Sequence, residues 1–466
     1  MRSIAAARRG AAGGANRWRH ASDWAHVAAS RSSMRVSNKI RDIVDQLDLE
    51  KVNKAKTLIP LSIGDPTKFG NLDTDRSVSG AILSAVHTGM YNGYPPSDGY
   101  VESRAAVAEA YSTAHHPLEA DDVSLTSGCS HALQIAIEVL CNPGDTLLIP
   151  NPAFPLYETI ADHLVRALSP CLSSLAHCLQ APRAQGRPRA QGVTASKYEL
   201  LPERGWEADL ADLRAQLSAA ARPAAILVNN PSNPCGSVYS TEHLRAILAL
   251  ADEFKVPIIA DEIYGDMVFP GEAGAEPPPF EYMAQLTDSV PVLSCNGIAK
   301  RYLVPGWRLG WVVAYDKQGI FEAGGVLRGI KQLTQIIVGP NSLIQSVLPP
   351  VLERTPATFY DTTMATLKEH AEFTVSRLGQ VEALSPVRPD GAMYVMVGVD
   401  TSRFGEGIDD DVSFARLLLE EESVFVLPGQ CFGKADFFRI VTCPPLPALG
   451  EAYDRIAAFC ERHRVR

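Results

Sequence analysis

The stretch that most constrains this chain runs from Ser294 to Trp311 and reads SCNGIAKRYLVPGWRLGW. It places Lys300 directly after three small or apolar residues, 297–299. A lysine amine that attacks a carbonyl needs an uncrowded site and a lowered pKa. The turn Pro305-Gly306 precedes Arg308, so the chain can fold back and bring this guanidinium near the amine. The stretch therefore predicts a reactive amine beside a guanidinium.

The pair of Lys300 and Arg308 indicates a particular cofactor. A guanidinium binds phosphate through a planar two-point contact, and a lysine amine can hold an aldehyde as a Schiff base. Pyridoxal 5'-phosphate carries both groups, so we expect it as the cofactor. The alternative is a surface lysine and an arginine in a solvated turn, which is the usual role of single lysines.

Residues 297–310, GIAKRYLVPGWRLG, resemble the pyridoxal-phosphate attachment motif of the class I aminotransferases. The form with AKR before VPGWRLGW is most similar to the branch of that family that acts on tyrosine. The resemblance covers about 38–163 and 192–466. It implies an α/β chain of fold-type I, with a mostly parallel sheet in a large domain and a smaller α+β C-terminal domain. It also implies a homodimer with shared active sites.

The reaction that this resemblance implies is transamination of an aromatic L-amino acid, with L-tyrosine and 2-oxoglutarate giving 4-hydroxyphenylpyruvate and L-glutamate. Three alternatives stay open. The donor could be alanine, phenylalanine or kynurenine, the chain could be a pyridoxal-phosphate lyase on the same fold, or it could be a non-catalytic binding protein that kept the scaffold.

The composition narrows the class of protein. A chain of 466 residues that is 46% hydrophobic can bury a large core in two domains. A net charge of -10 argues against nucleic-acid binding, and no apolar stretch is long enough to span a membrane. Nine cysteines without CxxC pairs indicate reduced thiols, with neither a disulfide framework nor a zinc site. We therefore expect a cytoplasmic enzyme with no metal.

Two segments fall outside the expected domains. Residues 1–36 are rich in arginine with Asp23 as their one acid, which predicts either a mitochondrial transit peptide or an over-long start before Met34. Residues 164–191 contain no acid and predict an exposed insert or a gene-model error. The expected division is an N-terminal arm with part of the small domain at 37–90, the large domain at 91–325 and the small domain at 326–466.

Hydrophobic patterns predict several elements of the domains. They favour helices at 37–49, 357–380 and 411–422, a long helical run from about 326, and loops that include 270–279. They favour strands at 123–126, 291–294, 393–397 and 438–441, and buried strands that open the segments 224–236 and 256–269.

The turn after the strand at 123–126 opens a helix at Ser130. A glycine turn at a helix start presents unpaired backbone amides, which suit a phosphate. The resemblance assigns this phosphate to Ser127 and to the amides of Gly128 and Cys129. It also places Phe154 over the face of the pyridine ring, whereas the alternative for Phe154 is core filling.

The strands that open 224–236 and 256–269 each end in polar side chains. Ligands of α/β folds lie at the carboxyl ends of strands. The resemblance implies that Asn233 donates to the cofactor's phenolate oxygen, that Tyr264 reaches the same oxygen from a helical face shared with Asp261, and that Asp261 keeps the pyridine nitrogen protonated. The alternatives are a turn-forming Asn-Pro for Asn233 and a helix N-cap for Asp261.

The resemblance also implies the substrate contacts. Gly64, in the loop LSIGDPTKFGN, would line the carboxylate site together with Asn233. Arg439, in the apolar strand FFRIVT, would clamp the α-carboxylate, with a structural ion pair as the alternative. The Tyr94 hydroxyl would reach the cofactor phosphate of the other subunit, with Tyr91 as a rival for that role.

One position departs from the family pattern. Many relatives place a phosphate-binding serine three residues before the lysine, where this chain has Gly297. The phosphate would then depend on Arg308, on backbone amides and on Ser127. In addition, the sequence marks no second cation for the distal carboxylate of a dicarboxylic acceptor.

Overall fold

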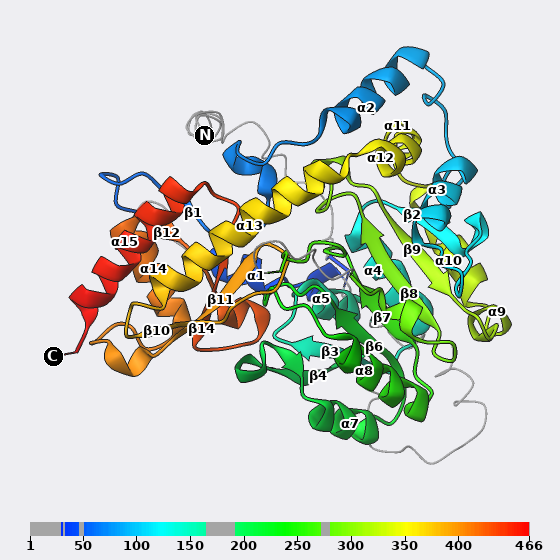
Figure 1. The fold of residues 1–466 in the computed structure, drawn as a ribbon. Helices are drawn as coiled ribbons and strands as arrows, with labels where there is room; N and C mark the ends of the chain where they lie inside the picture. The colour runs from blue at the N-terminus through cyan, green and yellow to red at the C-terminus, as the bar shows by residue number, and fades with distance from the viewer. Residues whose placement is uncertain (1–28, 31–32, 46–50, 165–191, 272–279, 466) are drawn as a thin grey trace, which may run out of the picture.

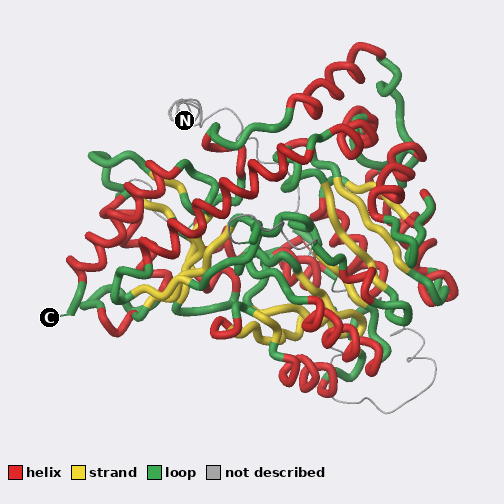
Figure 2. The backbone as a smooth tube through the Cα atoms, in the orientation of Figure 1, coloured by secondary structure: helices red, strands yellow, loops and turns green. Residues whose placement is uncertain are grey.

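The computed structural model describes residues 29–30, 33–45, 51–164, 192–271 and 280–465 (Figure 1). The predictions for 1–36, for the insert at 164–191 and for the loop at 270–279 therefore lie mostly outside the described residues, at 1–28, 31–32, 165–191 and 272–279. Figure 2 shows two lobes, each with its own sheet and its own covering of helices. The large lobe lies on the right of the view and the small lobe on the left.

The large lobe contains an eight-stranded sheet in the order β2-β9-β8-β7-β6-β3-β4-β5. The strands from β8 to β4 are parallel, while β9 runs antiparallel to both β2 and β8. The strand bounds are β2 Val123–Thr126, β3 Thr146–Asn151, β4 Thr194–Leu201, β5 Glu207–Ala208, β6 Pro223–Asn229, β7 Ile258–Asp261, β8 Val292–Gly297 and β9 Gly310–Tyr315.

Helices cover both faces of this sheet (Figure 1). Successive residues of a strand point to opposite faces, so Ile258 and Ile259 belong to two separate apolar clusters. No helix of the described ranges has the length and apolar character of a membrane span. The helix bounds are α2 Arg76–Thr88, α3 Val101–Tyr111, α4 Cys129–Leu140, α5 Leu156–His163, α7 Leu210–Ala219, α8 Thr241–Phe254, α9 Ile320–Ala323, α10 Val326–Thr334, α11 Ser342–Ser346 and α12 Leu348–Arg354.

The small lobe is built on a four-stranded sheet of order β10-β11-β14-β13. Its elements are β10 Leu384–Pro386, β11 Tyr394–Val399, β13 Leu427–Pro428, β14 Phe437–Val441, α13 Ala357–Leu378, α14 Asp411–Glu422 and α15 Leu446–His463. A short parallel pair joins β1 (Ile59–Pro60) to β12 (Val424–Phe425). The N-terminal part of the chain therefore packs with the C-terminal lobe.

The predicted elements compare with the structure as follows. The strand at 123–126 is confirmed as β2, and the helices at 357–380 and 411–422 are confirmed as α13 and α14. The helix at 37–49 corresponds to α1 (Lys39–Val44), which Asn38 caps, and 46–50 lie outside the described residues. The long helical run predicted from about 326 consists of the helices α10 to α13, because left-handed residues at Val338 and Gly339, followed by a proline, break it after α10.

The sheet topology gathers the predicted site residues at one edge. Asn229, Asp261 and Cys295 are register partners at the carboxyl ends of β6, β7 and β8. Because β9 is antiparallel to β8, its first residue lies at that same edge. The segment before β9, which carries Arg308, therefore meets the segments that follow the other strands.

Candidate active site

A cavity of about 470 Å³ lies between the two lobes at this edge of the sheet. Side chains from both lobes line it, and they include most of the residues singled out from the sequence. These are Gly64, Cys129, Phe154, Asn233, Asp261, Tyr264, Lys300, Arg308 and Arg439. The sequence therefore identified most of one continuous site.

Lys300 follows β8 and points its amine into the cavity. Its Nζ donates a hydrogen bond to the carbonyl oxygen of Gly64 at 2.6 Å and lies 5.6 Å from the centroid of the Tyr264 ring. The contact with Gly64 brings the loop before α2 to the amine. The structure thus places Lys300 where a bound carbonyl compound would meet it.

Asp261 is buried at the end of β7 and accepts several hydrogen bonds. The Tyr157 hydroxyl donates to its Oδ2 at 2.5 Å, and the Cys129 thiol lies 3.7 Å from its Oδ1. Burial raises the pKa of Asp261, and the hydrogen bond from Tyr157 opposes that rise. Burial and the Asp261 charge raise the pKa of Tyr157 well above its usual value, so its hydroxyl stays a donor.

Tyr264 meets a tyrosine from the other lobe. Its hydroxyl lies 2.6 Å from that of Tyr394, and burial, followed by the neighbouring Tyr394, raises the pKa of Tyr264 well above its usual value. The hydroxyl is therefore protonated at neutral pH. The predicted helical face shared with Asp261 is wrong, because 263–266 form a turn that ends in the left-handed residue Asp266.

Arg439 is buried on β14, between the rings of Tyr394 and Phe432. It donates from Nη1 to the side-chain oxygen of Asn233 and from Nη2 to the carbonyl of Ser62, both at 2.7 Å. Its Nε has no partner among the described residues. No carboxylate of the described chain pairs with it, so the ion-pair alternative is wrong there, and three of its five N–H groups remain for an anion.

Arg308 and the turn before α4 form a second polar end of the cavity. Gly128 has a φ of 81°, and a Cβ atom on it would lie 2.6 Å from Nη2 of Arg308. The Gly128 amide, predicted as a phosphate donor, donates instead to the carbonyl of Thr126 at 2.8 Å. The first amides of any helix lack an intrahelical acceptor, so Cys129 and Ser130 are the open donors at this end.

The Ser127 amide is also engaged, because it donates to Nδ1 of His131 at 3.2 Å. Neither Ser127 nor Gly128 is among the residues that line the cavity, whereas Ser130 is. Any role of the Ser127 hydroxyl toward a phosphate stays a prediction.

The surroundings of Gly297 explain why this chain has no serine three residues before Lys300. A Cβ atom at this position would lie 2.7 Å from the carbonyl oxygen of Leu309 and 2.9 Å from the Cα of Gly310. Both atoms belong to the backbone, which cannot give way as a side chain does. The tight pairing of β8 with β9 therefore excludes a side chain at this position without a shift of the sheet.

The two tyrosines of the loop before α3 differ in their surroundings. Tyr94 is 91% exposed and lies outside the cavity lining. Tyr91 is half-buried and packs edge-on against Tyr100, with ring centroids 5.8 Å apart. Of the two, Tyr94 has the hydroxyl that is open to another molecule, and its contact with a second subunit stays a prediction.

Four functional candidates were missed from the sequence: Tyr157, Tyr394, Ser62 and Arg41. Tyr157 and Tyr394 are buried, and a buried tyrosine hydroxyl needs a partner, but no spacing rule links either to the residue that it meets. Arg41 lies on α1, which the sequence predicted as a plain amphipathic helix. Only the folded arrangement brings these side chains to the site.

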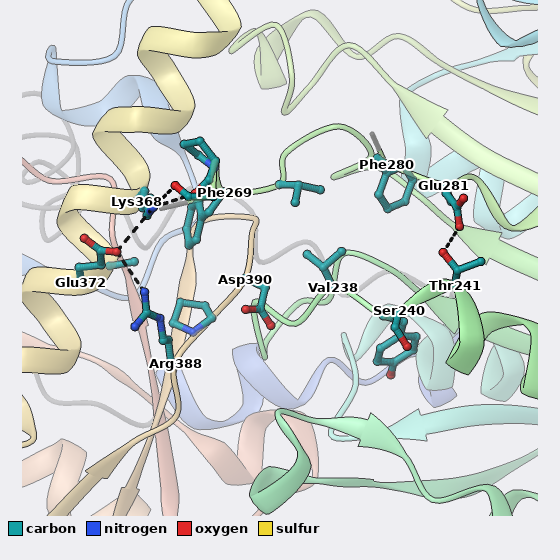
Figure 3. Close-up of a pocket in the computed structure, with 16 residues that line it drawn as sticks. Val238, Ser240, Thr241, Phe269, Phe280, Glu281, Lys368, Glu372, Arg388 and Asp390 are labelled. Atoms are coloured by element: carbon teal, nitrogen blue, oxygen red, sulfur yellow. Dashed lines mark hydrogen bonds and ion pairs between the residues drawn. The ribbon is translucent and has the colours of Figure 1, made fainter. Parts of the chain in front are cut away.

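A second cavity of similar volume, about 470 Å³, also lies between the lobes (Figure 3). Several of its charged groups already have partners. Lys368 donates to the carbonyl oxygens of Pro270 and Gly271, while Arg388 pairs with Glu372 at 3.1 Å. It contains none of the predicted site residues, so we assign the chemistry to the first cavity.

The chain is similar to known proteins over most of its length. The sequence profile of the family described as "Aminotransferase class I and II" matches residues 56–170 and 188–456. The chain is 45% identical to the tyrosine aminotransferase of Mus musculus, over 94% of this chain and 88% of that protein. It is 43% identical to the tyrosine aminotransferase of Dictyostelium discoideum, over 95% and 98% of the two chains.

Among solved structures, the fold is similar to the tyrosine aminotransferase of Leishmania infantum. The TM-score is 0.81 at 31% sequence identity, and the match covers 95% of this chain and all of that one.

Proposed function

Because this chain belongs to the class I and II aminotransferases, we propose that it transfers the amino group of L-tyrosine to 2-oxoglutarate with pyridoxal 5'-phosphate as its cofactor. One observation carries the proposal, namely the meeting of Lys300, Asp261, Arg308 and Arg439 in a single cavity between two lobes. The names and the extent of the relatives support the choice of tyrosine as donor.

The residues present fit this cofactor. A primary amine, a buried carboxylate and a guanidinium beside a helix start match its aldehyde, its ring nitrogen and its phosphate. The space beside Gly128 is filled by the Arg308 guanidinium, so a phosphate there would meet a cation and the open amides of α4. When bound, this cofactor supplies the electron sink that stabilises negative charge on the α-carbon of an amino acid.

Lys300 would act on the substrate proton. Its amine sits between the Gly64 carbonyl and the Tyr264 ring, and it can take the α-proton of the donor and return a proton during the second half of the reaction. Asp261, held by the Tyr157 hydroxyl, would face a cationic ring nitrogen, which offsets the cost of burying the carboxylate.

Arg439 would bind the α-carboxylate common to donor and acceptor. Two of its N–H groups hold Asn233 and Ser62, which fixes the guanidinium plane, and the others can form a two-point contact. The apolar side chains of Ile40, Phe425 and Leu427 line the same cavity and can contact the ring of an aromatic donor.

The proposed assembly is a homodimer. Large apolar side chains are exposed along α2 and the loop after it, with Leu83 at 62% and Met90 at 74% exposure. The Ser342 hydroxyl donates to the carbonyl of Tyr91, which joins this loop to the start of α11, and Ile336 nearby along the chain is 72% exposed. Several large apolar side chains exposed close together are typical of a subunit interface.

The function is tested with a panel of amino donors. The enzyme, supplied with pyridoxal 5'-phosphate and 2-oxoglutarate, should convert tyrosine with a higher kcat/KM than alanine, phenylalanine or kynurenine, measured as the keto acid formed. Lys300→Ala should lower turnover by about 1000-fold or more while the circular dichroism spectrum and Tm stay near native. A preference for another donor, or full activity of this variant, would contradict the proposal.

A further inference from the structure

A transaminase that uses tyrosine and a dicarboxylic oxo acid must accept two unlike side chains in one cavity. The α-carboxylate of either ligand fits Arg439, but the distal carboxylate of the acceptor needs a cation of its own. We propose that Arg41 on α1 binds this distal carboxylate and so sets the acceptor specificity. The inference rests on the proposed function and extends it.

The first reason to choose Arg41 is that the other cations of the cavity already have a role. Within the described residues, its lysines and arginines are Arg41, Lys300, Arg308 and Arg439. Lys300 is the reacting amine, Arg308 lies against the glycine turn, and Arg439 is held by Asn233 and Ser62. Arg41 is the one cation left without an assigned task.

The second reason to choose Arg41 is that its side chain is exposed and has no side-chain partner within the described part. Its guanidinium is exposed, and no hydrogen bond or ion pair joins it to another side chain of the described part. The other charged groups of α1 are engaged, because Lys39 forms an ion pair with Glu158 at 2.5 Å and Asp42 accepts from the Ser37 hydroxyl. Arg41 therefore keeps its donors available for a ligand.

The packing of α1 places Arg41 at the substrate end of the cavity. The apolar face of α1, formed by Ile40, Ile43 and Val44, packs against a cluster that contains Phe432. The ring of Phe432 lies 4.7 Å from the guanidinium carbon of Arg439. One aromatic layer thus separates α1 from the residue that would hold the α-carboxylate.

The same helix suits the aromatic donor. Ile40 and Val44 line the cavity beside Arg41, and their apolar side chains can contact the ring of an aromatic donor. An exposed arginine can turn toward a carboxylate, or away from a ring into solvent, without moving the backbone. One short helix can therefore serve both ligands.

The test compares two acceptors that differ in the distal carboxylate alone, with tyrosine as donor. For Arg41→Gln we expect the KM for 2-oxoglutarate to rise about 10- to 100-fold, while the KM for 2-oxopentanoate, the kcat and the KM for tyrosine change less than about 3-fold. Arg41→Lys should restore part of the affinity. Lys39→Gln removes a positive charge from the same helix outside the cavity lining and should leave every constant near native.

A binding measurement separates this inference from the proposed function. Glutarate and pentanoate are titrated into the holoenzyme, and Arg41→Gln should weaken glutarate selectively. If the native enzyme fails to use tyrosine with 2-oxoglutarate, the proposed function is overturned. If the native enzyme does use them, two results for Arg41→Gln would overturn only the assignment of Arg41. The first is an unchanged KM for 2-oxoglutarate with unchanged glutarate binding. The second is an equal loss for 2-oxoglutarate and 2-oxopentanoate, and for glutarate and pentanoate.

Discussion

Tyr157 makes the shortest contact to Asp261 that the structure describes, and this contact leads to a first prediction. Tyr157→Phe removes the hydrogen bond and should raise the pKa of Asp261 further, since burial already raises it. We expect turnover to fall about 10-fold, equivalent to about 1.4 kcal/mol. The measurement is single-turnover conversion of the donor.

Tyr198→Phe is the matched control for Tyr157→Phe. The Tyr198 hydroxyl is equally buried and donates to the carbonyl of Leu227 at 2.9 Å, within the sheet and away from the cavity lining. Both variants should lose about 1–2 kcal/mol of stability, but Tyr198→Phe should keep its turnover. Equal losses of turnover would show that the Tyr157 hydroxyl acts through stability alone.

Glu262 gives a prediction about pH. It is buried, accepts from the Ser294 hydroxyl at 2.5 Å and from the Met283 amide at 2.8 Å, and burial raises its pKa to about 7. A carboxyl whose pKa is higher in the folded chain than in the unfolded chain binds its proton more tightly when folded. The native protein therefore loses stability as pH rises from about 4.5 to about 7, and the loss is complete above that range.

Glu262→Gln removes this titration and can keep both hydrogen bonds. The free energy of unfolding of the variant, minus that of the native protein, should increase by up to about 3 kcal/mol between pH 4.5 and 7 and then stay level. Urea unfolding at a series of pH values measures this difference. Parallel stability profiles for the two proteins would contradict the assignment.

The sequence was sufficient to predict the charged residues of the site. It was not sufficient to predict the residues that hydrogen-bond to them. Lys300, Asp261 and Arg439 stand out because a reactive amine, an acid at a strand end and an arginine in an apolar strand each require an explanation. Tyr157 and Tyr394 read as ordinary core tyrosines. Their hydroxyls gain a role through contacts between segments that are far apart in the chain.

At the scale of elements, the pairing of β8 with β9 leads to a further prediction. Gly297→Ser introduces the serine that the family pattern predicts at this position, but its Cβ would meet the backbone at 2.7 Å from the Leu309 oxygen. We expect a loss of about 1–3 kcal/mol in stability, measured by urea unfolding. Gly306→Ser is the control, because a Cβ there has open space, and it should change stability by less than about 0.5 kcal/mol.

Sequence patterns predicted elements where local signals were strong. The strand at 123–126 alternates apolar and hydroxyl side chains up to a glycine turn, and the helices at 357–378 and 411–422 bury residues at a helical spacing. The turn at 263–266 was mistaken for a helix, because the left-handed conformation of Asp266 has no strong signature in a single sequence. The pair of β1 with β12 was missed because two-residue strands carry almost no pattern of their own.

For the whole molecule, the exposed apolar surface along α2 predicts a dimer. Leu83→Asp should convert the dimer to a monomer, because a carboxylate would be buried without a partner at the interface. Size-exclusion chromatography with light scattering measures the mass, and activity should fall with it if Tyr94 completes the partner's site.

Ile320→Asp is the control for Leu83→Asp. Ile320 is 49% exposed on α9, which lies apart from α2 in Figure 1, and this variant should keep the mass of the native protein. A native protein that is monomeric at micromolar concentration would contradict the proposed homodimer.

The two-lobed plan also follows in part from the sequence. The alternation of buried strands and helices up to about residue 320 predicts an α/β lobe, and the structure contains an eight-stranded, mostly parallel sheet there. How the lobes meet depends on many weak contacts between distant segments. The position of α1 beside Phe432, which brings Arg41 to the cavity, is one such outcome.

The small lobe joins segments from opposite ends of the chain. Besides the pairing of β1 with β12, the Asn53 amide donates to the Glu420 carbonyl and the Val441 amide donates to the Leu61 carbonyl, both at 2.9 Å. On the ribosome, all eight strands of the large sheet emerge before the partners of residues 53–61 are translated. The early segment must therefore wait, and Arg439 should take its place in the cavity only near the end of synthesis.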